Sequence, residues 1–105
     1  AFINIKSKAY EAASQNYTKL IALDKSNASY HLNRALAYMN LKNYNAALFD
    51  LSRVIEIDPD NSEAYYNRSN VYLQLSENKK SCTDMRKSAE LGYEQAFQYI
   101  ASLCQ

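Results

Sequence analysis

Apolar side chains recur along this chain every three or four residues, the spacing that places them on one face of an α-helix. The pattern is clearest over residues 28–41 and 44–57, where leucine, alanine, isoleucine and valine follow this period. It predicts well-formed helices over residues 10–23, 28–41, 44–57, 62–75, 78–91 and 93–103. A further helix over residues 2–7 is expected to be short, because its pattern is poor. Consecutive helices joined by short turns fold as antiparallel hairpins.

Residues with special backbone properties mark several helix ends. Pro59, the only proline, follows Asp58 and stops the preceding helix, since proline cannot donate the next backbone hydrogen bond. Asn61 or Ser62 can cap the following helix through a side-chain oxygen. Gly92, the only glycine, lies where the fifth long helix ends and where a positive φ is favourable. The scarcity of both residue types predicts long helices without interruption.

The same kinds of side chain return at a spacing of 34 residues. The aligned columns are Tyr10, Tyr44 and Asn78; Ala13, Ala47 and Ser81; Tyr17, Leu51 and Met85; and Leu23, Ile57 and Leu91. A fixed repeat of this length indicates a stacked array, in which each unit buries its apolar face against its neighbours. We therefore divide the single domain, residues 1–105, into a partial first repeat (1–27), a second repeat (28–61), a third repeat (62–92) and a capping helix (93–105).

This pattern of tyrosine, small residue, aromatic residue and Asp-Pro resembles the tetratricopeptide repeat, a helix-turn-helix unit of the same length. Residues 44–59 match its second helix almost position for position, whereas His31 and Tyr65 stand where a tryptophan-like residue is usual. Residues 89–96 resemble the end of bacterial repeat proteins of this kind. The resemblance implies an all-α, right-handed superhelical stack of antiparallel helix hairpins with a C-terminal capping helix. It also implies that the concave side binds proteins or peptides.

The first helix of each hairpin faces the concave side in such an array. The candidate peptide-binding groove there comprises Ser29, Leu32, Asn33, Leu36, Met39, Asn40, Glu63, Tyr66, Asn67, Asn70, Leu73 and Gln74. The resemblance implies that these columns contact a peptide, with an apolar floor edged by amides. The alternative is that the stripe only packs helix against helix. Charged residues in place of Leu36 and Tyr66 distinguish the two, because they would abolish binding in a groove but unfold a core.

One subtype of the family grips the terminal carboxylate of chaperone tails with lysines, asparagines and an arginine. Asn33 matches one of these asparagines, but the other matching positions hold Phe2, Glu63 and Asn67. An acidic residue at position 63 would repel a carboxylate. We therefore do not expect this chain to bind a partner in that way.

Composition and charge narrow the function classes. The chain has 105 residues and a formal net charge of +1, which is atypical of nucleic-acid-binding proteins and of polybasic membrane anchors. Its apolar runs, such as residues 20–23, are too short to cross a bilayer. We therefore expect neither a nucleic-acid partner nor direct membrane insertion. The chain starts at Ala1 without a signal sequence, and we interpret it as a piece trimmed from a longer protein.

Candidate catalytic and metal-binding residues are few. A general base needs a nucleophile and an orienting partner, and the repeat supplies neither to His31, the only histidine. A zinc site needs about four clustered ligands, and two cysteines with one distant histidine do not supply them. Phosphate-binding loops need several glycines, and the chain has only Gly92. Acidic residues such as Asp50 and Asp84 are scattered, and we interpret them as solvated faces and helix caps. Neither enzymatic activity nor a cofactor is predicted.

Two cysteines flank the turn at Gly92. Cys82 precedes this glycine by ten residues and Cys104 follows it by twelve, so both fall near the far end of a hairpin. A disulfide between them would fasten the capping helix and indicate an oxidising, extracytoplasmic compartment. Two buried thiols are the alternative, with the cytoplasm as the default location.

The sequence thus predicts a non-catalytic module that binds a protein or peptide on its concave face. Self-assembly is the alternative function, because the truncated first repeat leaves an open apolar end that could stack against another copy.

Overall fold

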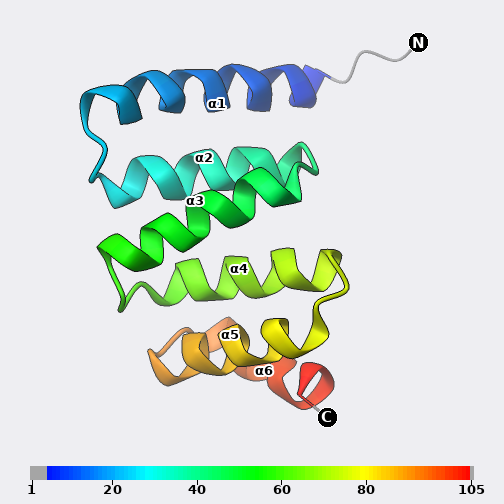
Figure 1. Cartoon of the computed structure of the whole chain (residues 1–105). Helices are drawn as coiled ribbons and strands as arrows, with labels where there is room; N and C mark the ends of the chain where they lie inside the picture. Colours follow the sequence, from blue (N-terminus) through cyan, green and yellow to red (C-terminus); the bar gives the residue numbers. More distant parts are fainter. Residues whose placement is uncertain (1–4, 105) are drawn as a thin grey trace.

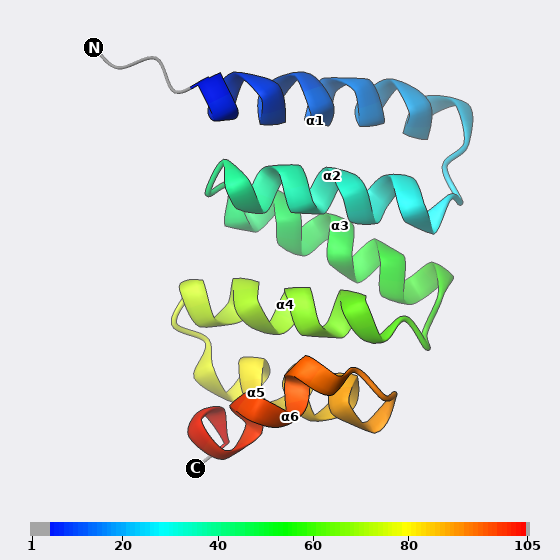
Figure 2. The same cartoon turned by 180° about the vertical axis from the view of Figure 1, so that it is seen from behind.

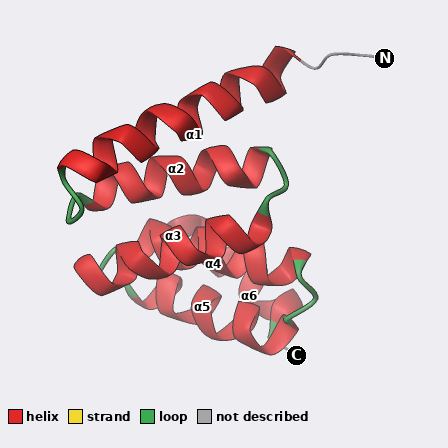
Figure 3. Cartoon of the chain, turned by 45° about the horizontal axis from the view of Figure 1, so that its top comes forward, coloured by secondary structure: helices red, strands yellow, loops and turns green. Residues whose placement is uncertain are grey.

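The computed structural model describes residues 5–104, which form six α-helices and no strand (Figure 1). The helices are α1 (Ile5–Leu23), α2 (Ala28–Asn40), α3 (Tyr44–Ile57), α4 (Ser62–Gln74), α5 (Asn78–Glu90) and α6 (Glu94–Leu103). Short loops join them at alternating ends, so that consecutive helices run antiparallel (Figure 3). The predicted all-α stack of helix hairpins is confirmed. None of the helices in this part of the chain is long and apolar enough to span a membrane.

The prediction of a separate short helix over residues 2–7 is wrong for residues 5–7, the part of this range that the structure describes. Residues 5–7 form the first turn of α1, which continues without a break to Leu23, and Phe2 lies outside the described residues. The turns after α2 and α4 pass through Lys42 and Ser76 with positive φ, but Lys8, one repeat before Lys42, is helical.

The helices stack as a slab, and the substantial helix–helix contacts all join consecutive helices. The principal extents are 39 × 37 × 20 Å, and the Cα radius of gyration of 14.2 Å exceeds the roughly 13 Å of a compact domain of this length. Helices α2, α4 and α6 form one side, which we call the inner face, and it is turned to the viewer in Figure 2. Helices α1, α3 and α5 form the other side, the outer face.

Buried small residues allow the two helices of each hairpin to approach closely. In the second repeat Ala35 and Ala47 are fully buried and form a cluster with Leu51. In the third repeat the corresponding positions are Ser69 and Ser81, also fully buried. The Ser69 hydroxyl donates to the Ser81 backbone carbonyl at 2.7 Å and lies 2.9 Å from the Ser81 hydroxyl. These hydrogen bonds offset the cost of burying two polar groups.

The predicted caps form at the helix ends. The Asn61 side chain accepts from the Ala64 backbone amide at 3.0 Å at the start of α4. Gly92 follows α5 with φ +96°, its amide donates to the Ala89 carbonyl, and the Tyr93 amide donates to the Ser88 carbonyl. This pair of bonds satisfies carbonyls that the helix end would otherwise leave unpaired.

A disulfide fastens the last helix to the stack. Cys82 on α5 and Cys104 at the end of α6 are joined, with their Cα atoms 5.1 Å apart. Because α6 makes its substantial contacts with α5 alone, this bond adds a covalent link to the most weakly held element.

We expect Gly92→Ala to lower the free energy of unfolding by about 1–2 kcal/mol, because a Cβ disfavours a positive φ. No heavy atom lies within 4 Å of the added Cβ, so the loss of stability reports the backbone conformation alone and no steric clash. Urea unfolding measures it. Ser76→Gly is the matched control, since Ser76 already holds φ 61° and should gain stability or stay unchanged. Unchanged stability in Gly92→Ala would contradict this interpretation.

The disulfide predicts that the denatured protein exposes no free thiol without reductant and two after reduction. A thiol-reactive dye measures both values. Two free thiols before reduction, in protein purified without reductant and with air oxidation allowed, would show that the bond does not form.

Candidate functional site

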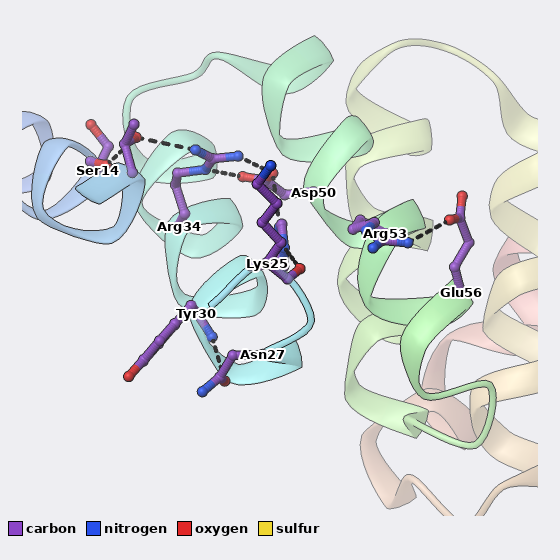
Figure 4. A network of polar contacts seen from close by, with 10 residues as sticks. Ser14, Lys25, Asn27, Tyr30, Arg34, Asp50, Arg53 and Glu56 are labelled. Carbon is purple, nitrogen blue, oxygen red and sulfur yellow. Dashed lines mark hydrogen bonds and ion pairs between the residues drawn. The ribbon is translucent and has the colours of Figure 1, made fainter. Parts of the chain in front are cut away.

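An arginine in α2 ties three helices together (Figure 4). Arg34 donates from Nε and Nη2 to the two carboxylate oxygens of Asp50 on α3, at 2.8 and 2.7 Å. Its Nη1 donates to Thr18 Oγ1 on α1 at 3.1 Å. The hydrogen bonds to Asp50 raise the pKa of Arg34, against the opposing effect of burial, so the guanidinium stays charged. A bidentate pair of this kind fixes direction as well as distance.

The same arrangement returns one repeat later. Arg68 on α4 donates to the Asp84 carboxylate at 2.7 and 2.9 Å and to Ser52 Oγ at 3.3 Å. Its pKa is raised for the same reason. We call these two sets the arginine clamps. Each clamp joins a first helix to the second helix of its own repeat and to that of the repeat before.

The interpretation of Asp50 and Asp84 as solvated residues is wrong. Asp50 is 0% exposed and Asp84 is 5% exposed, because each carboxylate lies inside the stack against its arginine. The sequence contained the signal: the arginines at 34 and 68 and the aspartates at 50 and 84 both repeat at 34 residues. A charge that recurs in the same column as its counter-charge indicates a structural ion pair.

His31 belongs to the same buried layer. Its Nε2 lies 2.9 Å from the Lys25 carbonyl oxygen, which can only accept, so we assign the ring proton to Nε2. Its Nδ1 lies 3.7 Å from Asp50 Oδ1 and makes no hydrogen bond within the described residues. The ring thus positions the loop between α1 and α2. No group of three or more metal-ligating side chains occurs among residues 5–104.

Part of the predicted groove forms a hollow on the inner face. It has a volume of about 300 Å³ between α2 and α4. We call this space the inner hollow. It is lined by Leu36, Met39, Asn40, Tyr44, Asn70 and Gln74. Five of these were predicted from the sequence as groove residues, whereas Tyr44 was identified there only as a member of a repeat column. No hydrogen bond within the described part of the chain engages the side-chain amides of Asn70 and Gln74.

The other predicted groove residues lie outside the inner hollow. Leu32 packs against the cluster around Ala35. Asn67 is only 9% exposed, so it offers little surface to a ligand. Ser29, Asn33 and Leu73 are exposed elsewhere on α2 and α4.

The capping helix covers Tyr66. The Tyr66 ring lies 4.7 Å from the ring of Tyr93 and 6.3 Å from that of Tyr99, centroid to centroid. Tyr66 also packs against the second buried cluster, which includes Met85. Burial raises the pKa of Tyr93, and the nearby Glu63 adds to this shift. These residues form the contact between α4 and α6, which the repeat pattern alone does not reveal.

Comparisons with known proteins agree with this geometry. Tetratricopeptide repeat family models match residues 5–42, 28–61 and 51–83. The Arabidopsis OM64 TPR domain is 30% identical; the match covers 94% of this chain and 84% of that domain, with a TM-score of 0.87. The chain belongs to the tetratricopeptide repeat family. Among curated proteins, none matches the sequence.

Two further solved TPR domains carry bound peptides. The second TPR domain of human RPAP3, in complex with the HSP70 peptide SGPTIEEVD, is 30% identical with a TM-score of 0.84; the match covers 91% of this chain and 82% of that one. The first TPR of Spaghetti (RPAP3), bound to the HSP90 peptide SRMEEVD, is 25% identical with a TM-score of 0.87, over 93% and 79% of the two chains.

We expect Asp50→Asn to lower the free energy of unfolding by about 2–4 kcal/mol, because it leaves the charge of Arg34 largely buried and unpaired. Urea unfolding by circular dichroism measures the loss. Glu56→Gln is the matched control on the same helix. Its partner Arg53 lies at 3.0 Å in an exposed pair, so the change should stay within about 0.5 kcal/mol. Equal losses in the two variants would contradict the clamp.

Proposed function

We propose that this TPR chain is a non-catalytic scaffold that binds a protein or peptide partner on its inner face. The inner hollow carries the proposal, because it combines apolar side chains and amides from two first helices in one place. Leu36 and Met39 supply apolar area, and Asn40, Asn70 and Gln74 can pair with the backbone of an extended or helical peptide. A preformed surface keeps the ordering cost of binding low.

The related TPR domains support this choice of function. Two of them hold short peptides, and both share the fold and 25–30% of their sequence with this chain. We do not propose the same carboxylate grip, since Glu63 and the buried Asn67 stand at positions that this grip uses. The partner is instead expected to insert an apolar side chain beside Leu36.

Assembly through the first helix is the second candidate function. Leu23 is 86% exposed, and Leu20 is 36% exposed although Val54, one repeat later, is 0% exposed. Among the described residues, α1 has its substantial contacts with α2 only, which leaves this apolar stripe open to a second copy. Sedimentation at rising concentration separates this function from a monomeric scaffold.

The disulfide supports a location outside the cytoplasm. Disulfides persist in oxidising compartments and are rare in reducing ones, so we infer that the chain works in the former. A bacterial origin stays a prediction from residues 89–96.

We expect Leu36→Glu to weaken binding of a peptide by at least about tenfold, since it buries a charge in place of an apolar contact. The peptide is one selected by display against the unmodified chain, and fluorescence anisotropy measures its Kd. Leu36 is not among the residues packed on the buried clusters, so the fold should survive, with an unchanged circular dichroism spectrum.

Leu23→Glu is the control for this experiment, because it makes the same change on α1 away from the hollow. It should leave the Kd of the peptide unchanged. A selected peptide that binds both variants and the unmodified chain equally well would exclude the inner hollow as the site.

A further inference from the structure

A second hollow lies on the opposite side of the slab from the inner hollow. It has a volume of about 390 Å³ and opens between the end of α1 and the middle of α3, with α2 as its floor. We call this space the outer pocket. It is lined by Thr18, Ile21, Ala22, Lys25, His31, Arg34, Phe49 and Arg53. Figure 4 shows Lys25, Arg34 and Arg53 arranged around this region.

Comparison of the two repeats explains why the hollow exists. One repeat later, the position of Ala22 holds Glu56 and the position of His31 holds Tyr65. Both later side chains are larger, and the Tyr65 ring lies 5.7 Å from the Arg68 guanidinium carbon, over the equivalent clamp. The smaller side chains at 22 and 31 leave space at two positions that larger side chains occupy in the next repeat.

Phe49 gives the outer pocket an unusual apolar rim. It is 70% exposed, and the equivalent position one repeat later holds the polar Thr83. The clamps hold the helix that carries it, so the ring is presented from a fixed position. Together with Ile21 and Ala22 it forms an apolar wall that water covers in the free chain.

All charged residues that line the outer pocket are basic. Arg34 is neutralised by the buried Asp50, so it contributes shape more than charge. Arg53 pairs with Glu56 in an exposed contact, which a ligand can replace at little cost. No ion pair within residues 5–104 engages the Lys25 ammonium. The rim therefore offers two cations at the edge of an apolar wall.

We propose that the outer pocket binds an acidic peptide segment of a partner protein. An aromatic side chain of the segment packs against Phe49 and Ile21, and its neighbouring carboxylates pair with Lys25 and Arg53. An apolar wall with a cationic rim complements this chemistry in both charge and shape. The site is independent of the inner hollow, so one chain can hold two partners at once.

The test uses two short peptides and the whole chain labelled with ¹⁵N. One peptide has a single phenylalanine flanked on each side by two glutamates, and the other has lysines in place of the glutamates. The acidic peptide should shift the amide signals of Ile21, Ala22, Phe49 and Arg53, and the basic peptide should not. Arg53→Glu should weaken the acidic peptide about five- to tenfold, because an attraction becomes a repulsion.

Two further variants complete the test. Ala22→Trp should abolish the shifts, because Ala22 is exposed and the larger side chain fills the hollow without entering the core. Lys87→Glu, which changes the position equivalent to Arg53 one repeat later, should leave the affinity unchanged. Circular dichroism checks the fold of each variant.

Three outcomes would overturn the proposal. The first is the absence of any shift at 10 mM acidic peptide, a concentration about tenfold above a millimolar Kd. The second is equal binding of the two peptides, and the third is shifts confined to the inner hollow. None of them would overturn the inner-face binding proposed above, which is tested with other variants and another peptide.

Discussion

The bidentate bond between one arginine and one aspartate in each repeat is the constraint on which the rest of the structure depends. Small buried residues such as Ala35 and Ser69 let helices approach closely, but apolar contact alone lets them slide and rotate. The clamps remove that freedom, because two parallel hydrogen bonds define an angle between α2 and α3 and again between α4 and α5. Their third bond fixes each hairpin to the one before it.

This fixed stacking explains how a chain whose substantial helix–helix contacts join only consecutive helices presents a defined binding surface. The inner hollow draws on α2 and α4, which belong to different repeats and have α3 between them in the chain. Its shape therefore depends on the angle between neighbouring repeats. Since the clamps set this angle from within the stack, side chains of the inner hollow such as Leu36, Asn70 and Gln74 are available for a partner.

Much of the fold could be predicted from the sequence because the repeat samples the same environment more than once. The columns at Ala47 and Leu51 identified buried positions correctly, and Gly92 marked a turn with positive φ. Five residues of the inner hollow were predicted from the helical period together with the family resemblance. The clamps were missed because charged residues were assumed to be exposed, although Arg34 and Asp50 both recur at the repeat spacing.

Other features depend on elements that break the repeat. Tyr66 falls in a groove column, but α6 packs over it through Tyr93 and Tyr99. The outer pocket arises where two residues, Ala22 and His31, are smaller than their equivalents, and only packing in three dimensions turns this difference into a hollow. A periodic pattern predicts what the repeats share and says little about where they differ.

The central claim is that the inner face, held by the clamps, is the main binding surface. Paramagnetic broadening by a spin-labelled peptide, selected by display against the unmodified chain, tests it most directly. We expect the strongest broadening at the amide signals of Leu36, Asn40, Asn70 and Gln74, with weaker broadening on α1, which does not line the inner hollow. Broadening centred on α1 and α3, with these four signals intact, would contradict it.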